Sequence, residues 1–152
     1  MYGRADDGAA GPAQLGLAEI NVPILPERSG QLLRQALQER FERVSGVVER
    51  RYDLVVSYAL AGDAIGYQQD SSVTRVRVTG NATWSLHAQD AQRSTLVSGT
   101  ARNVDGYNIQ DQQYFASDLT SDVVYRRVAG AVADQIALQL GAYFNKRATA
   151  AN

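Results

Sequence analysis

The 152-residue chain has no cysteine, one histidine and one lysine, and each scarcity excludes some chemistry. Without cysteine there are no disulfides, thiolate metal sites or cysteine nucleophiles. A single imidazole, that of His87, cannot build a histidine-rich metal site. Every basic side chain except Lys146 is arginine, whose forked guanidinium suits carboxylate and phosphate groups. An arginine-biased genome would explain the same composition.

The chain also lacks a strong net charge and a long apolar run. Its formal net charge is −1, so no overall field attracts nucleic acid or an anionic membrane. No apolar run approaches the ~20 residues that span a bilayer. We expect one domain at 15–146, between a flexible Gly/Ala/Asp-rich arm at 1–14 and a tail at 147–152. The arm begins abruptly, and removal of a preceding targeting segment would explain this start.

Polar and apolar residues alternate from Val73 to His87, which predicts one long strand. At roughly 3.3 Å per residue it would run about 45 Å. This pattern predicts a sheet with one dry face and one open polar face, a platform suited to binding. The apolar side comprises Val76, Val78, Ala82, Trp84 and Leu86, and the polar side comprises Arg75, Arg77, Thr79, Asn81, Thr83, Ser85 and His87.

The remaining elements follow from periodicity and turn residues. Strands are expected at 17–25, at 52–60 with a continuation to 67, and at 95–104, before a polar loop at 105–108. A first helix runs from an N-cap at Ser29 to Gly46, and a last one starts near Ser117 or Thr120. The order β-α-β-β-β-α predicts an α+β sandwich, with two helices on the apolar face of a four-stranded, mostly antiparallel sheet.

The enzyme interpretation has little support in the sequence. His87 falls on the polar side near a strand end, as a surface histidine does. Asp105, Asp111 and Asp118 have spacings that match no calcium loop. No phosphate-binding glycine loop or nucleophile elbow is present, so we expect no catalytic residue, cofactor or metal. A small enzyme with His87 and a loop aspartate as its base pair would need a concave apolar cavity enclosed by the sheet.

Two groups of side chains are candidates for binding. Arg75 and Arg77 share a strand face, and Arg102 on the next strand is placed to join them. Converging guanidinium groups hold the phosphates of an anionic ligand, whereas separated ones are simply solvated.

Aromatic residues precede the last helix and form the second group. They predict either an anchor for a partner protein or a group that packs under the sheet and fixes how the last helix begins. The residues of this candidate partner interface are Tyr107, Asn108, Tyr114 and Phe115.

The chain resembles the LptE family of lipopolysaccharide-assembly lipoproteins, in its alphaproteobacterial form, over nearly its whole length. The order and spacing of several motifs carry this resemblance. They are Tyr2-Gly3, Arg28-Ser29-Gly30 with Leu33 and Leu37, Val78-Thr79-Gly80-Asn81-Ala82-Thr83, Asp105-Gly106-Tyr107-Asn108 through Tyr114-Phe115-Ala116, and Ala133-Asp134-Gln135-Ile136 with Leu140.

The resemblance implies a non-enzymatic lipoprotein at the periplasmic face of the outer membrane. An acylated cysteine upstream of Tyr2, absent from this chain, would supply its membrane anchor. The domain would plug and support an LptD-like β-barrel and bind lipopolysaccharide, with no nucleic-acid partner. A polar sheet face suits the polar interior of such a barrel. An accessory periplasmic lipoprotein of another lipid transporter is the alternative.

Part of the family pattern does not transfer to this chain. In enterobacterial relatives, basic residues before the long third strand and before the final helix contact lipopolysaccharide. The matching positions here are Tyr67 and Ser117. Arg75, Arg77 and Arg102 are therefore the candidate lipopolysaccharide ligands in this sequence.

Overall fold

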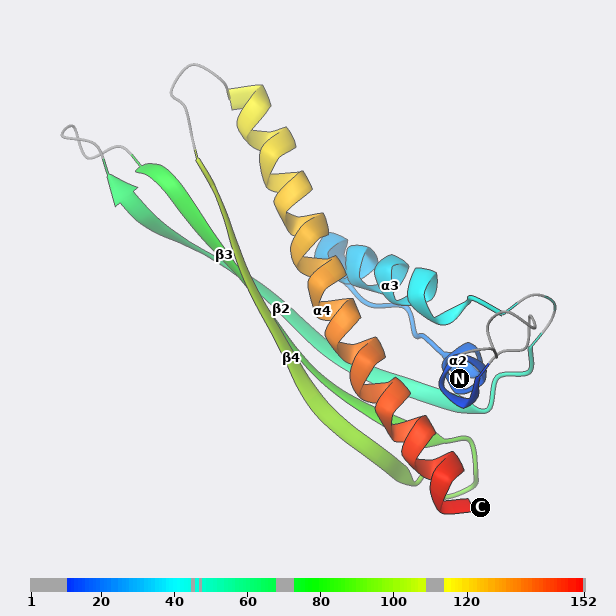
Figure 1. Cartoon of the computed structure of the whole chain (residues 1–152). Coiled ribbons are helices and arrows are strands. Elements are labelled where there is room, and N and C mark those ends of the chain that lie inside the picture. Colours follow the sequence, from blue (N-terminus) through cyan, green and yellow to red (C-terminus); the bar gives the residue numbers. More distant parts are fainter. Residues whose placement is uncertain (1–10, 45, 47, 68–72, 109–113, 152) are drawn as a thin grey trace.

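A computed structural model describes residues 11–44, 46, 48–67, 73–108 and 114–151 (Figure 1). Long ribbons of sheet run beside one long helix, and shorter helices lie next to it. The elements are α2 (Pro12–Ala18), β1 (Ile20–Asn21), α3 (Glu27–Phe41), β2 (Tyr52–Tyr67), β3 (Val73–Ala88), β4 (Thr95–Asn108) and α4 (Tyr114–Ala151).

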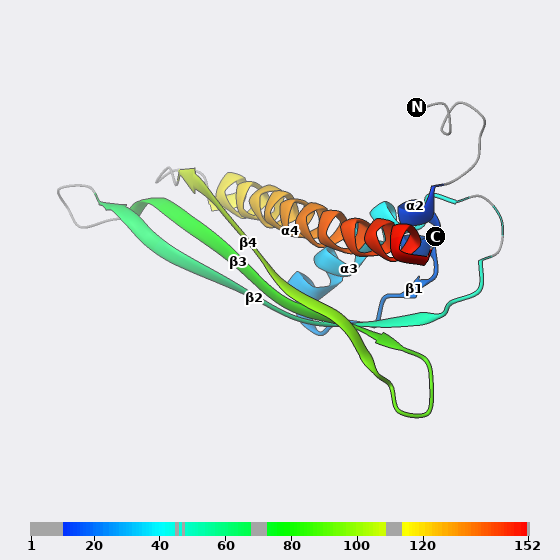
Figure 2. The same ribbon diagram turned by 60° about the horizontal axis from the view of Figure 1, so that its bottom comes forward.

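The sheet has the strand order β1-β2-β3-β4. β1 pairs in parallel with β2, and β2, β3 and β4 form the predicted antiparallel meander. The ladder between β2 and β3 shifts register on both sides of Gly66. Figure 2 shows the described helices on one side of the sheet and none of them on the other. The predicted α+β class and the one-sided covering are therefore confirmed.

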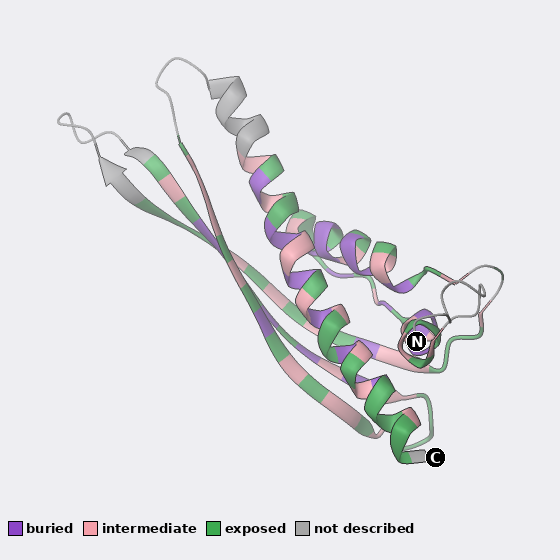
Figure 3. Ribbon diagram, in the orientation of Figure 1, coloured by how far each residue is buried: buried purple, intermediate pink, exposed green. Residues whose placement is uncertain are grey.

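The core lies between the helices and the inner face of the sheet (Figure 3). Trp84 and Leu86 of β3 are buried there, as the alternation predicted. The i+4 stripe of α4 covers them, because residues at this spacing share one helix face. Its buried members are Val124, Val128, Val132, Ile136, Leu140 and Phe144.

The expected first strand at 17–25 is wrong in its extent. Residues 12–18 form helix α2, so Pro12–Gln14 of the expected arm are helical. The strand keeps only Ile20–Asn21. Helix α2 packs on α4, where Gly16 lies against the ring of Phe144. This tertiary contact, which no local pattern shows, selects the helix. Within the described residues the sandwich therefore has three helices rather than the two expected.

Other boundaries also differ from the prediction. α3 begins at Glu27, with Pro26 rather than Ser29 at its N-cap. The expected loop at 105–108 belongs to β4, because Asp105–Asn108 pair with Arg75–Val78 of β3. α4 starts at Tyr114 and continues through most of the expected tail to Ala151. None of the described helices combines the length and apolarity needed to cross a bilayer.

Two glutamines of α4 bind the edge strand β4. The side-chain amide of Gln135 donates to the carbonyl of Arg102 at 2.7 Å and accepts from its N–H at 3.0 Å. Gln139 donates to the carbonyl of Thr100 at 2.9 Å and accepts from Trp84 Nε1 at 2.9 Å. Exposed backbone groups at a sheet edge invite pairing with another chain. α4 therefore closes part of this edge.

Tyr58 of β2 carries a buried hydroxyl with no hydrogen-bond partner among the described residues. Burial raises the pKa of Tyr58 from 10.0 to about 12. A raised pKa means that the fold favours the neutral phenol. Its contribution to stability is complete below pH 10 and is lost as the pH rises towards 12.

We expect Tyr58→Phe to raise the free energy of unfolding by about 1 kcal/mol at neutral pH, because it removes an unsatisfied buried group. The variant should also lose less stability than the parent between pH 10 and 12. Urea unfolding across this range measures both effects. A less stable variant at neutral pH would show that the hydroxyl is satisfied in solution.

Candidate functional site

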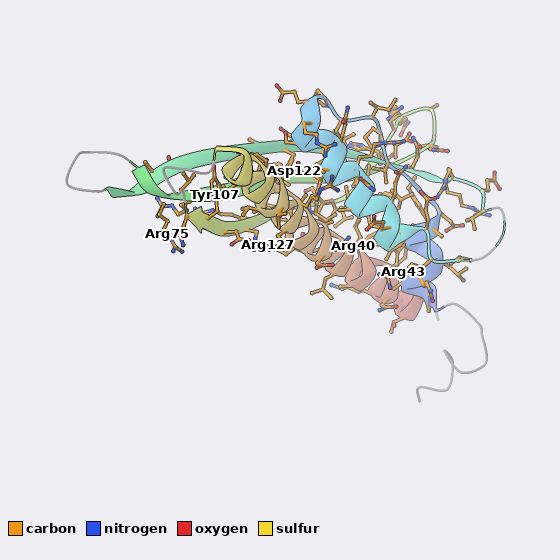
Figure 4. The ribbon with its side chains drawn as sticks, turned by 90° about the horizontal axis from the view of Figure 1, so that it is seen from above. Arg40, Arg43, Arg75, Tyr107, Asp122 and Arg127 are labelled. Carbon is orange, nitrogen blue, oxygen red and sulfur yellow. The ribbon has the colours of Figure 1, made fainter. Side chains whose placement is uncertain are left out.

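Arg75 and Arg77 project from the outer, polar face of β3, as their sequence parity predicted. Arg75 pairs with Asn108 and Arg77 with Gly106, so both arginines stand beside the last residues of β4. Together with Val104, Asp105 and Gly106 they line an open pocket of about 290 Å³. Figure 4 shows Arg75 and Tyr107 towards the end of the sheet beside the first half of α4. We call this pocket the arginine site.

Gly106 lies beside the guanidinium of Arg75. A Cβ placed on Gly106 would lie 3.6 Å from Nη2 of Arg75 and 3.1 Å from the carbonyl oxygen of Val76. A side chain at that position would touch the arginine at an ordinary van der Waals distance and would press more closely on the Val76 carbonyl oxygen. Arg75 has no carboxylate within 4.0 Å in the described part of the chain. Its charge is available to an anionic group from outside.

Asp105 lies at the border of the site and is held as a carboxylate. Desolvation by itself would raise its pKa. The Gly106 N–H at 2.8 Å, the Arg127 Nε at 2.8 Å and the charges of Arg127 and Arg75 outweigh this, so the pKa of Asp105 is below its ordinary value. Arg127 extends from α4, so this pair joins the last helix to the rim of the site. The positive charge of the site is therefore partly balanced.

Arg75, Arg77 and Arg102 do not form one converging group. Arg77 lies 3.8 Å from Asp63 of β2, in a pair exposed to solvent. Arg102 pairs with Asn81, four residues along β4 from Gly106. At about 3.3 Å per residue this places Arg102 roughly 13 Å from the site along the strand. Arg102 shares the polar face but does not join Arg75 and Arg77.

The predicted partner-interface residues do not form one exposed group. Tyr107 points to the inner face and packs against the core, while its neighbour Asn108 is exposed. This supports the packed interpretation for Tyr107. Tyr114 and Phe115 begin α4, but their side chains lie outside the described residues.

His87 belongs to a hydrogen-bonded surface cluster near the turn between β3 and β4. One ring nitrogen lies 2.8 Å from the hydroxyl of Ser85, and the other lies 3.2 Å from the carbonyl oxygen of Arg93 and 3.3 Å from Thr95 Oγ1. Among the described residues, no hydrogen bond or ion pair joins His87 to an aspartate. Asp111 and the side chain of Asp118 lie outside the described residues. The geometry gives His87 the surroundings of a surface residue.

Solved bacterial lipoproteins have the same fold. A putative lipoprotein from Caulobacter crescentus CB15 matches with a TM-score of 0.70 and 19% identity, covering 88% of this chain and 96% of that one. The rare lipoprotein B from Shewanella oneidensis matches at 0.60 and 12% identity, over 86% and 97% of the two chains. A minor lipoprotein from Acinetobacter baumannii matches at 0.57 and 17%, over 82% and 89%. None of the curated proteins matches the chain.

The family model of LptE, described as lipopolysaccharide-assembly, matches residues 17–140. This span includes all four described strands, α3 and most of α4. The chain therefore belongs to the LptE family. The resemblance inferred from the order of its motifs is confirmed.

Proposed function

We propose that this protein is a non-enzymatic outer-membrane lipoprotein that supports and plugs an LptD-like barrel and binds lipopolysaccharide. The observation that carries the proposal is the family match over residues 17–140. The open polar face of the sheet supports it physically, since hydrogen-bonding side chains on that face can replace water against a polar barrel interior. An N-terminal lipid anchor would hold the domain at the periplasmic face of the membrane.

The barrel partnership is tested with the full-length, lipidated protein expressed in its own host. Mild solubilisation, affinity purification and mass spectrometry should recover a large outer-membrane barrel in near-equal amount. Recovery of an inner-membrane lipid transporter instead would favour the alternative, an accessory periplasmic lipoprotein of that transporter. Recovery of neither would refute the barrel proposal.

Lipopolysaccharide binding is assigned to Arg75 and Arg77. Their guanidinium groups lie at one open pocket, and Arg75 has no described carboxylate within 4.0 Å. Each arginine can donate two parallel charge-assisted hydrogen bonds to a phosphate oxygen pair. Arg102 stands apart on the same face and would meet only a more distant group of the same glycolipid.

We expect the double substitution Arg75→Ala, Arg77→Ala to weaken lipopolysaccharide binding at least about ten-fold, because hydrogen bonds to charged groups are lost. The melting temperature should change little, since exposed ion pairs contribute little to stability. Affinity of the parent should also fall with salt, because exposed charges are screened over about 8 Å at physiological ionic strength. Titration with purified lipopolysaccharide measures these changes.

The matched control removes two exposed arginines that are not on the sheet, Arg43→Ala and Arg126→Ala. Arg126 belongs to α4, and Arg43 lies two residues after the end of α3 (Figure 4). The control changes net charge by the same amount and should leave binding nearly unchanged. Equal weakening by the two double variants would assign the effect to overall charge and remove the arginine site from the proposal.

A further inference from the structure

The two edges of the sheet differ in whether their outward backbone groups are hydrogen-bonded. Glutamines of α4 occupy backbone groups of β4, as described above. On the opposite side β1 pairs only at Tyr52 and Asp53 of β2. Beyond these pairs, no described residue outside the sheet is hydrogen-bonded to the backbone of Leu54–Ala64. We call Leu54–Ala64 the open edge.

The sequence explains why β1 stops where it does. Pro23 and Pro26 have no backbone N–H to donate, so the segment between them cannot extend the ladder along β2. The carbonyl of Pro23 is instead bound by Arg34 Nε of α3, at 3.1 Å. The chain therefore continues into α3. The place beside the open edge, where a longer β1 would pair with β2, is left free.

Hollows line this edge on the side of the diverted segment. A pocket of about 470 Å³ lies between Asn21–Pro26 and Asp53–Val56, and a second of about 190 Å³ continues it from Leu25 to Tyr58. Ile24 stands at the first pocket with 84% of its surface exposed, and Val55 opposite is 49% exposed. Most residues that line the first pocket are apolar, and Asn21, Asp53 and Arg93 complete it. An open strand edge beside such a pocket is the arrangement that binds an extended peptide.

We propose that the open edge binds an extended segment of a partner polypeptide by β-strand addition, with an apolar side chain of that segment in the pocket of Ile24 and Val55. The acidic groups near the edge are already paired: Asp53 lies 3.3 Å from Arg93, and Asp63 lies 3.8 Å from Arg77. Because each carboxylate already has an arginine partner, neither requires a basic group on the bound segment. The occupant is therefore an uncharged, apolar β-forming segment.

A second copy of this chain fits the edge poorly. Antiparallel self-pairing that uses the whole open edge would centre on Ala59 and place Asp63 of one copy opposite Val55 of the other. The carboxylate of Asp63, which pairs with Arg77 at 3.8 Å in each copy, would then lie beside Ile24 and Val55, and desolvating this charge costs free energy. Peptide binding at this edge is separate from glycolipid binding at the arginine site, so either can hold without the other.

The experiment uses the full chain and a short end-blocked peptide of alternating threonine and valine. At saturating peptide we expect amide hydrogen exchange of alternate residues in the open edge to slow at least about ten-fold, because strand addition satisfies outward N–H groups. The same peptide with alternate amides N-methylated should bind at least about ten-fold more weakly. Amide-resolved NMR exchange provides the measurement.

Ile24→Ser tests the pocket, and Leu138→Ser on α4 is its matched control, because Leu138 is 76% exposed and does not line the pocket. We expect Ile24→Ser to weaken peptide binding at least about ten-fold and Leu138→Ser to leave it unchanged. Unchanged exchange at Leu54–Ala64 with saturating peptide would overturn the proposal. Equal binding of the N-methylated peptide would do the same. Concentration-dependent dimers that protect this edge without peptide would assign it to self-association.

Discussion

Trp84→Ala is expected to lower the free energy of unfolding by about 3–5 kcal/mol, the range for removing a large aromatic side chain from a core. Trp84 of β3 is 2% exposed and belongs to the core. Its indole lies over Gly99, where an added Cβ would be 2.8 Å from Cζ2, and its Nε1 donates to Gln139 of α4. The substitution removes the packing and leaves the Gln139 amide without this donor.

Trp84→Phe is a smaller change at the same position. It keeps a six-membered aromatic ring but loses the hydrogen bond and the volume of the five-membered ring, so we expect a cost of about 1–3 kcal/mol. Urea unfolding followed by circular dichroism suits both variants, since Trp84 is the one tryptophan in the chain and its fluorescence is lost with it. A Trp84→Ala variant as stable as the parent would show that the helices do not pack on this face of the sheet.

Gly80→Ala should lower the free energy of unfolding by about 1–3 kcal/mol, through overpacking where α4 crosses β3. A Cβ on Gly80 would lie 2.5 Å from Cγ1 of Val128 and 3.0 Å from the hydroxyl of Tyr58. Val128 is fully buried and its β-branched side chain has few rotamers, so it cannot move away easily. The helix must shift or the strand must bend.

Gly62→Ala is the matched control on the neighbouring strand. The nearest atom to its added Cβ is Val76 Cγ1 at 3.6 Å, an ordinary contact. Since alanine reduces the entropy of the unfolded chain, this variant should be unchanged or more stable by about 0.4–1 kcal/mol. Thermal and urea unfolding of the pair give opposite signs if the helix crosses at Gly80. Equal effects would contradict that crossing.

Long periodic segments were predicted well from the sequence. β3 and the apolar stripe of α4 repeat one pattern over many residues, and burial of Trp84 and Ile136 confirms both. Short elements were predicted less well. Residues 12–18 are helical because they pack on α4, and Asp105–Asn108 remain in β4 although Asp-Gly and Asn usually mark turns. In both cases contacts distant in sequence override local preference.

The arginine site was predictable only in part. Strand parity placed Arg75 and Arg77 on the polar face, and the structure confirms it. The separation of Arg102 depends on the register between β3 and β4, which the sequence does not specify. Asp63 and Gly106 were not identified beforehand, since their roles arise only when neighbouring strands bring them beside the arginines.

The most direct test of the polar-face account is site-specific photo-crosslinking in the native host. Thr83 is exposed at the middle of that face, opposite Ser57 and Thr100, while Leu138 is exposed on the helical layer. A photoreactive residue at Thr83 of the lipidated protein should form a covalent adduct with an outer-membrane barrel. Barrel adducts from position 138 with none from position 83, at equal protein levels, would contradict docking through the sheet.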